Sequence, residues 1–135
     1  MDETQHKLAA ILSVFCENAA GDAARVATHR GDPCATTHDV VRALKLQALP
    51  SSGFFAHPDL ASRAQGHYNA LTNSSTRGGA HSHPTYPSIV PVDELVRRMR
   101  DADAEFDAWA PDTPETRTVK RAIERTATEF LGDLP

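Results

Sequence analysis

The longest continuous pattern in the sequence is a helical one near its start. Apolar residues between Asp2 and Gly31 recur at steps of three and four positions, and Gly31-Asp32-Pro33 supplies a stop signal. This predicts one long amphipathic helix over residues 2–31. A lone helix cannot bury such a stripe, so it must pack against other helices within the chain or in a dimer. The stripe consists of Leu8, Ile11, Leu12, Phe15, Ala19 and Val26.

A second helix is predicted directly after the first. Thr36 followed three residues later by Asp39 is typical of a helix N-terminus, because the threonine side chain caps the first turn and the acid lies near the positive end of the helix dipole. Pro50 ends this helix. Its apolar positions are Val40, Val41, Leu44 and Ala48.

Residues 51–91 have a different composition, rich in Gly, Ser, Pro, Thr and Asn. We expect a flexible linker here, with one or two helical turns around Asp59–Gln65 and partial disorder that is greatest over 73–83. The sequence thus divides into a helix pair over residues 1–55, a linker over residues 56–90 and a second helix pair over residues 91–135.

The second helix pair follows the linker. Helical periodicity runs from Val92 to Phe106 and is broken by Pro111. Thr113 can cap a last helix that begins at Pro114, a residue favoured at the first helical position. The apolar stripe of the last helix is Val119, Ile123, Ala127, Phe130 and Leu131. No strand pattern is evident, so the fold class is all-α.

Composition narrows the range of functions. The 135 residues contain 14 Lys and Arg against 18 Asp and Glu, a net charge of -4 that argues against a protein that coats DNA or an anionic membrane. No apolar run approaches the roughly 20 residues of a membrane span, and no leader pattern opens the chain. We therefore expect synthesis in the cytosol without a signal peptide and no membrane partner. Cys16 and Cys34 are expected to be reduced, with Cys16 in the core.

Enzymatic and metal-binding motifs are weak. His81-x-His83 supplies two ligands at best, whereas zinc needs three or four, so a solvated loop is the simpler interpretation. The carboxylates of residues 93–107 are typical of a solvated helix face. We expect no enzyme, no cofactor and no metal. Trp109 has two open interpretations: an anchor for a partner, or a cover for the junction of the last two helices.

An ungapped stretch from Leu12 to Phe54 carries short motifs in a fixed order. They are Phe15-Cys16-Glu17-Asn18, Asp22-Ala23, His29, Thr36, Asp39-Val40-Val41, Ala43-Leu44-Lys45, Gln47 and Gly53-Phe54. In this order residues 12–54 resemble the central helix, second loop and third helix of core histone four.

Residues 92–134 carry a looser set of motifs. These are Leu95-Val96-Arg97, Phe106, Ala122-Ile123-Glu124, Phe130-Leu131 and Leu134. They are similar to the first helix and the front of the long helix of core histone three. The order of the two halves is that of the fused histone doublets of some large DNA viruses, here truncated or degenerate. The resemblance implies histone-fold-like helix pairs joined by the long flexible linker.

The resemblance implies a handshake dimer with histone-fold proteins or with a second copy. Residues expected at the dimer interface are Leu12, Phe15, Val41, Leu44, Val96, Ile123 and Phe130. His29 occupies a position that contacts the neighbouring dimer in the family.

The implied DNA contacts are reduced. Gly31-Asp32-Pro33-Cys34 stands where the family has consecutive basic residues in its second loop, so phosphate affinity should be small there. Duplex DNA is therefore a weak expected partner of the chain alone. The basic residues left as weak candidates for DNA contact are Arg25, Arg30, Arg42 and Lys45.

Three functions follow from these observations. The first is a histone-fold chromatin protein that heterodimerises and takes part in or modulates nucleosome-like DNA packaging, located in the nucleus, or in the virion if viral. The second is an acidic histone-fold adaptor or chaperone-like subunit that binds proteins rather than DNA. The third is a degenerate, truncated doublet with residual fold only. Net charge favours the second, whereas the match to histone four favours the first.

Overall fold

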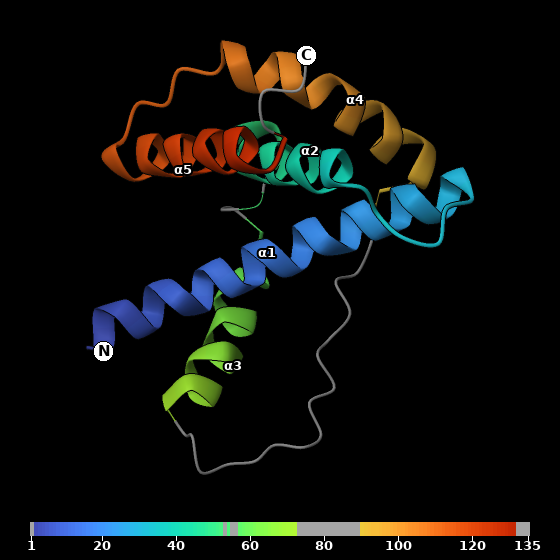
Figure 1. The fold of residues 1–135 in the computed structure, drawn as a ribbon. Helices are drawn as coiled ribbons and strands as arrows, with labels where there is room; N and C mark the ends of the chain where they lie inside the picture. Colours follow the sequence, from blue (N-terminus) through green and yellow to red (C-terminus); the bar gives the residue numbers. More distant parts are fainter. Residues whose placement is uncertain (1, 53, 55–56, 73–89, 132–135) are drawn as a thin grey trace.

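The computed structural model describes residues 2–52, 54, 57–72 and 90–131, and these residues are helical with short connections (Figure 1). No strand occurs in this part of the chain, so the all-α prediction is confirmed for it. The elements are α1 (Glu3–Arg30), α2 (Thr37–Ala48), the short 3-10 helix η1 (Pro50–Ser52), α3 (Leu60–Thr72), α4 (Val92–Ala108) and α5 (Pro114–Leu131).

Helix α1 spans 28 residues and has well-defined ends. At its start the Asp2 carboxylate accepts a hydrogen bond from the Gln5 amide at 2.8 Å, and the Gln5 side chain accepts one from the Asp2 amide at 2.9 Å. At its end Gly31 has φ 89°, in the left-handed region that glycine adopts without strain. The predicted long helix and its stop signal are therefore confirmed.

The predicted caps of α2 and α5 are also present. Thr36 Oγ1 accepts a hydrogen bond from the Asp39 amide at 3.1 Å, and Asp39 Oδ2 accepts one from the Thr36 amide at 2.9 Å. These reciprocal bonds satisfy two amides that have no partner inside the helix. At α5 the Thr116 amide donates to Thr113 Oγ1 at 3.2 Å.

Helix α2 is the centre of the packing. It contacts α1, α4 and α5, so both predicted helix pairs share it (Figure 1). One core cluster joins α1, α2 and α4, and a second adds α5 and the segment after α2. The buried residues of the first are Ala19, Ala23, Val26, Ala43, Leu46, Leu95, Met99 and Ala102. Those of the second are Val14, Phe15, Ala48, Leu49, Phe54, Phe106 and Ile123.

The most enclosed aromatic side chain shows how α2, α4 and α5 are joined. Phe106 of α4 is fully buried, and the ammonium groups of Lys45 from α2 and Lys120 from α5 lie 5.4 and 5.3 Å from its ring centroid. A cation over an aromatic face is attracted by the ring quadrupole. Phe106 therefore links three helices by apolar and electrostatic contacts at once.

Helix α3 differs from the expectation for residues 56–90. A helix of 13 residues lies inside the segment predicted to be a linker, where one or two turns were expected. Tertiary contact accounts for its length, because α3 packs against α1, and Arg63 of α3 reaches Asn18 of α1. The predicted disorder over 73–83 lies outside the described residues.

Replacing Thr36 by alanine is expected to lower the free energy of unfolding by about 1 kcal/mol, because the α2 cap loses its hydroxyl acceptor. Phe106→Ala should cost more, about 3–5 kcal/mol, because it leaves a cavity where three helices meet. Urea unfolding followed by circular dichroism measures both values.

The matched control is Thr37→Ala, which changes the exposed neighbouring threonine and should leave stability within about 0.5 kcal/mol of the parent. Equal effects of Thr36→Ala and Thr37→Ala would contradict the capping role of Thr36.

Candidate interaction surface

Arg30 is held by two carboxylates at the turn between α1 and α2. Its Nη2 and Nη1 atoms lie 2.7 and 3.1 Å from the Asp39 carboxylate oxygens, and its Nε lies 2.5 Å from Asp32 Oδ2. The hydrogen bonds from Arg30, aided by those from Thr36, lower the pKa of Asp39 to about 2 although burial opposes the charge. The predicted DNA contact Arg30 therefore has its charge matched within the chain.

Arg42 and Lys45 share a single acid on α4. Arg42 Nε lies 3.2 Å from Asp103 Oδ2, and Lys45 Nζ lies 2.9 Å from Asp103 Oδ1. Burial acts to raise the pKa of Asp103, but the hydrogen bonds and attraction of the two cations outweigh burial and lower it. These two predicted DNA contacts thus join α2 to α4.

Arg25 is the fourth predicted DNA contact and lies at the junction of α1 with α4. Its Nη2 atom donates to the Val90 carbonyl oxygen at 2.8 Å, and its charge attracts the Asp22 carboxylate. Burial nevertheless raises the pKa of Asp22, which accepts a hydrogen bond from Gln47 at 2.7 Å. The four candidates occupy three separate places, and the structure does not gather them into one basic surface.

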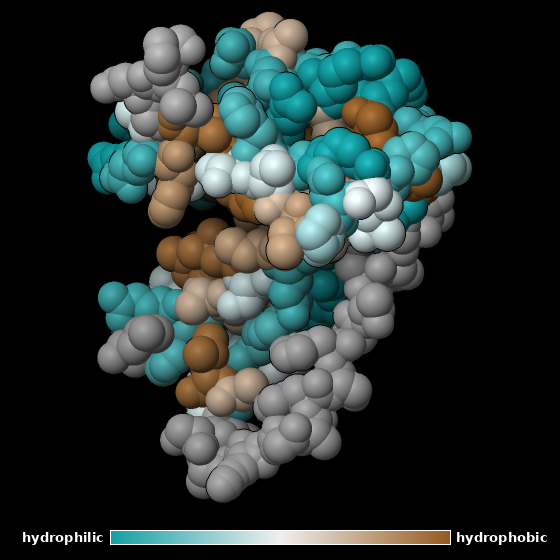
Figure 2. All heavy atoms as spheres, turned by 45° about the vertical axis from the view of Figure 1, so that its right-hand side comes forward, coloured by the Kyte–Doolittle hydropathy of each residue, from teal (hydrophilic) through white to brown (hydrophobic). Residues whose placement is uncertain are grey.

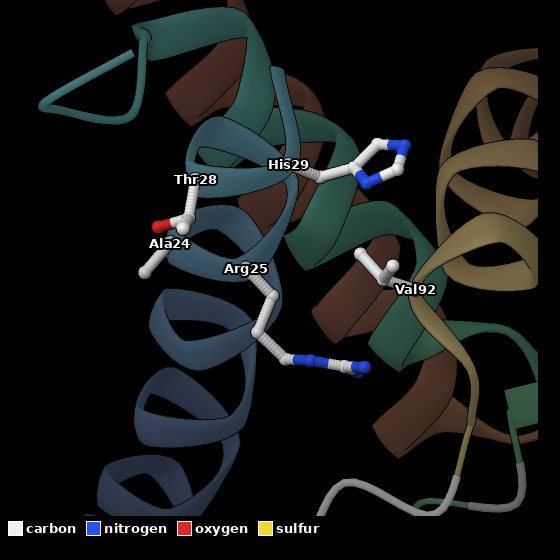
Figure 3. Close-up of a pocket in the computed structure, with 5 residues that line it drawn as sticks. All are labelled: Ala24, Arg25, Thr28, His29 and Val92. Atoms are coloured by element: carbon white, nitrogen blue, oxygen red, sulfur yellow. The ribbon is translucent and has the colours of Figure 1, made fainter. Parts of the chain in front are cut away.

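His29 borders a surface hollow of about 380 Å³ between α1 and the start of α4 (Figure 3). The other lining residues are Ala24, Arg25, Thr28 and Val92. Figure 3 shows His29 and Arg25 projecting from α1 toward Val92. His29 Nε2 lies 3.7 Å from Asp93 Oδ1, and both side chains are exposed. The residue expected at a neighbouring dimer is therefore accessible.

The predicted dimerisation residues divide into two groups. Phe15, Val41 and Ile123 are buried within the chain, and Leu44 and Val96 pack against its core. Leu12 and Phe130 are instead exposed, at 46% and 69%. The chain's own helices thus cover most of the apolar residues that a partner was expected to cover. Leu12 and Phe130 remain exposed and can contact a partner.

Exposed apolar side chains continue the pattern of Leu12. Leu8, one turn before it on α1, is 56% exposed. Figure 2 shows hydrophobic side chains on the surface between the upper and lower parts of the molecule. Positions i and i+4 of a helix lie on one face, so Leu8 and Leu12 form a continuous strip, which we call the α1 strip.

The contact of α3 with α1 is polar at its centre and was not predicted. Arg63 Nη1 donates to Asn18 Oδ1 at 2.7 Å, and Glu17 Oε1 lies 3.3 Å from Arg63 Nη2 and 2.8 Å from His67 Nε2. A hollow of about 200 Å³ lies between α1 and α3, and none of these polar residues lines it. The available signal was the spacing of Leu60 and Ala64 by four residues, since both pack against the second core cluster. The hollow is lined by Lys7, Ala10, Ile11, Ala61, Ala64, Gln65 and Tyr68.

Three residues with other predicted roles can be placed. Cys16 is exposed, so the expectation that it lies in the core is wrong, and partial burial raises the pKa of its thiol. Trp109 packs against Phe106 with ring centroids 6.0 Å apart, which favours the cover for the helix junction. His81 and His83 lie outside the described residues.

Comparison with protein-family models, curated proteins and solved structures finds no match to this chain. The resemblance to core histones therefore stays a prediction. Among the residues that the structure describes, no helix is both long enough and apolar enough to cross a membrane.

Replacing Asp39 by asparagine is expected to lower the free energy of unfolding at pH 7 by about 1.5–3 kcal/mol, the usual value of a hydrogen bond to a charged group. The pKa of Asp39 is depressed in the folded state, so its contribution is present above the ordinary carboxyl pKa of about 4. That contribution is lost as pH falls toward 2. Urea unfolding of both proteins between pH 7 and pH 2 measures the difference.

The control is Asp32→Asn, which removes the more exposed carboxylate from the same arginine and should cost below about 1 kcal/mol. A difference between Asp39→Asn and the parent that stayed constant from pH 7 to pH 2 would contradict the assigned role of the Asp39 charge.

Proposed function

We propose that the protein is a histone-fold-like adaptor that binds histone-fold proteins through the α1 strip and does not package DNA by itself. One observation favours the adaptor function over a DNA-packaging role. The four basic side chains that the histone resemblance assigns to DNA are engaged inside the chain, three with carboxylates and Arg25 with a carbonyl oxygen. A phosphate at Arg30, Arg42 or Lys45 would have to compete with the carboxylates that already pair with them.

The proposed partner class rests on the sequence. The motifs of residues 12–54 resemble core histone four, and histone folds bury their apolar faces against another histone fold. Leu12 supports a histone-fold partner because it belongs both to residues 12–54 and to the exposed α1 strip. Phe130 of α5, also exposed, supplies a large apolar side chain that a partner can cover.

The size of the apolar surface limits the expected affinity. Full burial of a leucine or phenylalanine side chain contributes about 1.5–3 kcal/mol, and the exposed residues of this surface are already partly covered. Association itself costs about 4–15 kcal/mol. Burial of Leu8, Leu12 and Phe130 alone therefore supports only a weak complex, and micromolar affinity, about -8 kcal/mol of binding free energy, requires further contacts with the partner.

Changing Leu8 and Leu12 together to glutamine is expected to weaken binding to a dimer of core histones three and four by tenfold or more. Glutamine keeps the helix propensity but removes the apolar surface. The partner dimer carries a fluorophore, and fluorescence anisotropy gives the dissociation constant. Light scattering after size exclusion gives the stoichiometry.

The matched control is Leu71→Gln, which removes a leucine of similar exposure, 43%, from α3. It should bind as the parent does. Absence of any complex with histone-fold proteins would overturn the adaptor function and favour the degenerate doublet. Equal weakening by the α1 and α3 variants would overturn the assignment to the α1 strip.

A further inference from the structure

Helix α3 is held against α1 with little help from the core. It lies on the side of α1 away from α2, α4 and α5 (Figure 1), and α1 is its main contact. Leu60 and Ala64, in its first half, pack against the second core cluster, whereas Leu71, in its second half, is exposed. Arg63 is the one buried residue of α3, every position of which the structure describes. The chain therefore buries fewer residues of α3 than of α1, α2 or α4.

A polar group holds the middle of α3. It consists of Glu17 and Asn18 of α1 with Arg63 and His67 of α3, and we call it the α3 latch. Arg63 Nη1 donates to Asn18 Oδ1 at 2.7 Å, and Glu17 Oε1 lies 2.8 Å from His67 Nε2. The Glu17 carboxylate also pairs with Arg63 at 3.3 Å. Water can replace these contacts when the two helices separate, so their net contribution to holding α3 in place is small compared with their strength.

The apolar contact beside the latch is incomplete. Ala10 and Ile11 of α1 line the hollow of about 200 Å³ between α1 and α3. Side chains that line a hollow lack contact atoms on one side and gain less from packing. A helix of 13 residues is also marginally stable on its own in water, so a detached α3 would lose its helical hydrogen bonds. Hydrogen exchange of the α3 amides therefore reports whether the helix is attached.

Detachment of α3 would enlarge the apolar surface next to the α1 strip. Ala10 is 1% exposed and Ile11 is partly buried, and both line the hollow under α3. Leu8, Ile11 and Leu12 have the i, i+3, i+4 spacing of the anchor residues of an amphipathic helix. With α3 attached, only Leu8 and Leu12 of these three are exposed. Helix α3 therefore covers part of the surface that a partner helix would contact.

We propose that α3 is an autoinhibitory cover of α1, which the α3 latch holds closed and which a partner of the α1 strip displaces. This role rests on the proposed adaptor function, which the cover regulates. Displacement adds Ala10 and Ile11 to the surface of the α1 strip and so supplies further contacts with the partner. While closed molecules dominate, the apparent dissociation constant equals the intrinsic one divided by the fraction of molecules with α3 detached. A weaker latch therefore gives tighter binding, by the factor by which that fraction rises.

The test weakens the latch from both sides, with Glu17→Gln in α1 and Arg63→Gln in α3. Each variant keeps a side chain of high helix propensity and removes the Glu17–Arg63 ion pair. Hydrogen exchange followed by mass spectrometry measures the α3 amides, and anisotropy of the labelled dimer of core histones three and four gives the dissociation constant. Both variants should exchange the α3 amides roughly tenfold faster and bind the dimer tighter by the same factor, since both quantities follow the detached fraction. The amides of α2 and α4 should exchange as in the parent.

The matched control is Arg97→Gln, which removes an arginine that pairs with Glu94 on the exposed side of α4 and should change neither measurement. Unchanged exchange of α3 in both latch variants, or faster exchange without tighter binding, would overturn the cover and leave the adaptor function standing. Absence of a complex with the parent and the variants alike would overturn the adaptor function and the cover with it. Arg63 is buried, so if its variant exchanges faster throughout the chain, Glu17→Gln decides, at a side chain that is 31% exposed.

Discussion

The hydrogen bonds between the Arg30 guanidinium and the Asp39 carboxylate fix the turn from α1 to α2, the two helices against which the others pack. They tie the last turn of α1 to the first turn of α2 across a connection that begins with Gly31. The same carboxylate accepts the Thr36 amide and so helps cap α2. Since α3 packs on α1, α5 packs on α2 and α4 packs on both, this turn lies at the junction that the other helices share.

This use of charge also shapes what the surface can bind. A guanidinium that is matched by a carboxylate inside the chain has lost most of the attraction that a phosphate would otherwise experience. Arg30 forms an ion pair with Asp39, and Arg42 and Lys45 form ion pairs with Asp103. The first pair joins α1 to α2, and the other two join α2 to α4. Residues that the sequence analysis offered as DNA contacts here stabilise the fold, so local ion pairing has to be considered together with net charge.

The sequence predicted the elements better than their packing. The helices around Thr36 and Thr113 have strong local signals, because a capping side chain acts within three residues of its position. The position of α3 depends instead on Arg63 meeting Asn18, a contact 45 residues away that no local pattern encodes. The ion pairs of the predicted DNA contacts could not be read from local sequence either. The partner of Arg42 and Lys45 is Asp103 on α4, 58 or more residues further along the chain.

Helix α1 explains why the interaction surface was the hardest part to predict. Alanines place further small apolar side chains beside the predicted stripe, so the sequence does not specify which part of the helix is covered. In the structure α2 and α4 cover its C-terminal half, where Ala23 and Val26 are buried. In the N-terminal half α3 covers one side through the polar group around Arg63, and Leu8 and Leu12 on another side stay exposed. The two halves therefore differ in their exposure: the C-terminal half is covered on its apolar side, whereas the N-terminal half buries Val14 and Phe15 but leaves Leu8 and Leu12 in solvent, where the proposed partner would cover them.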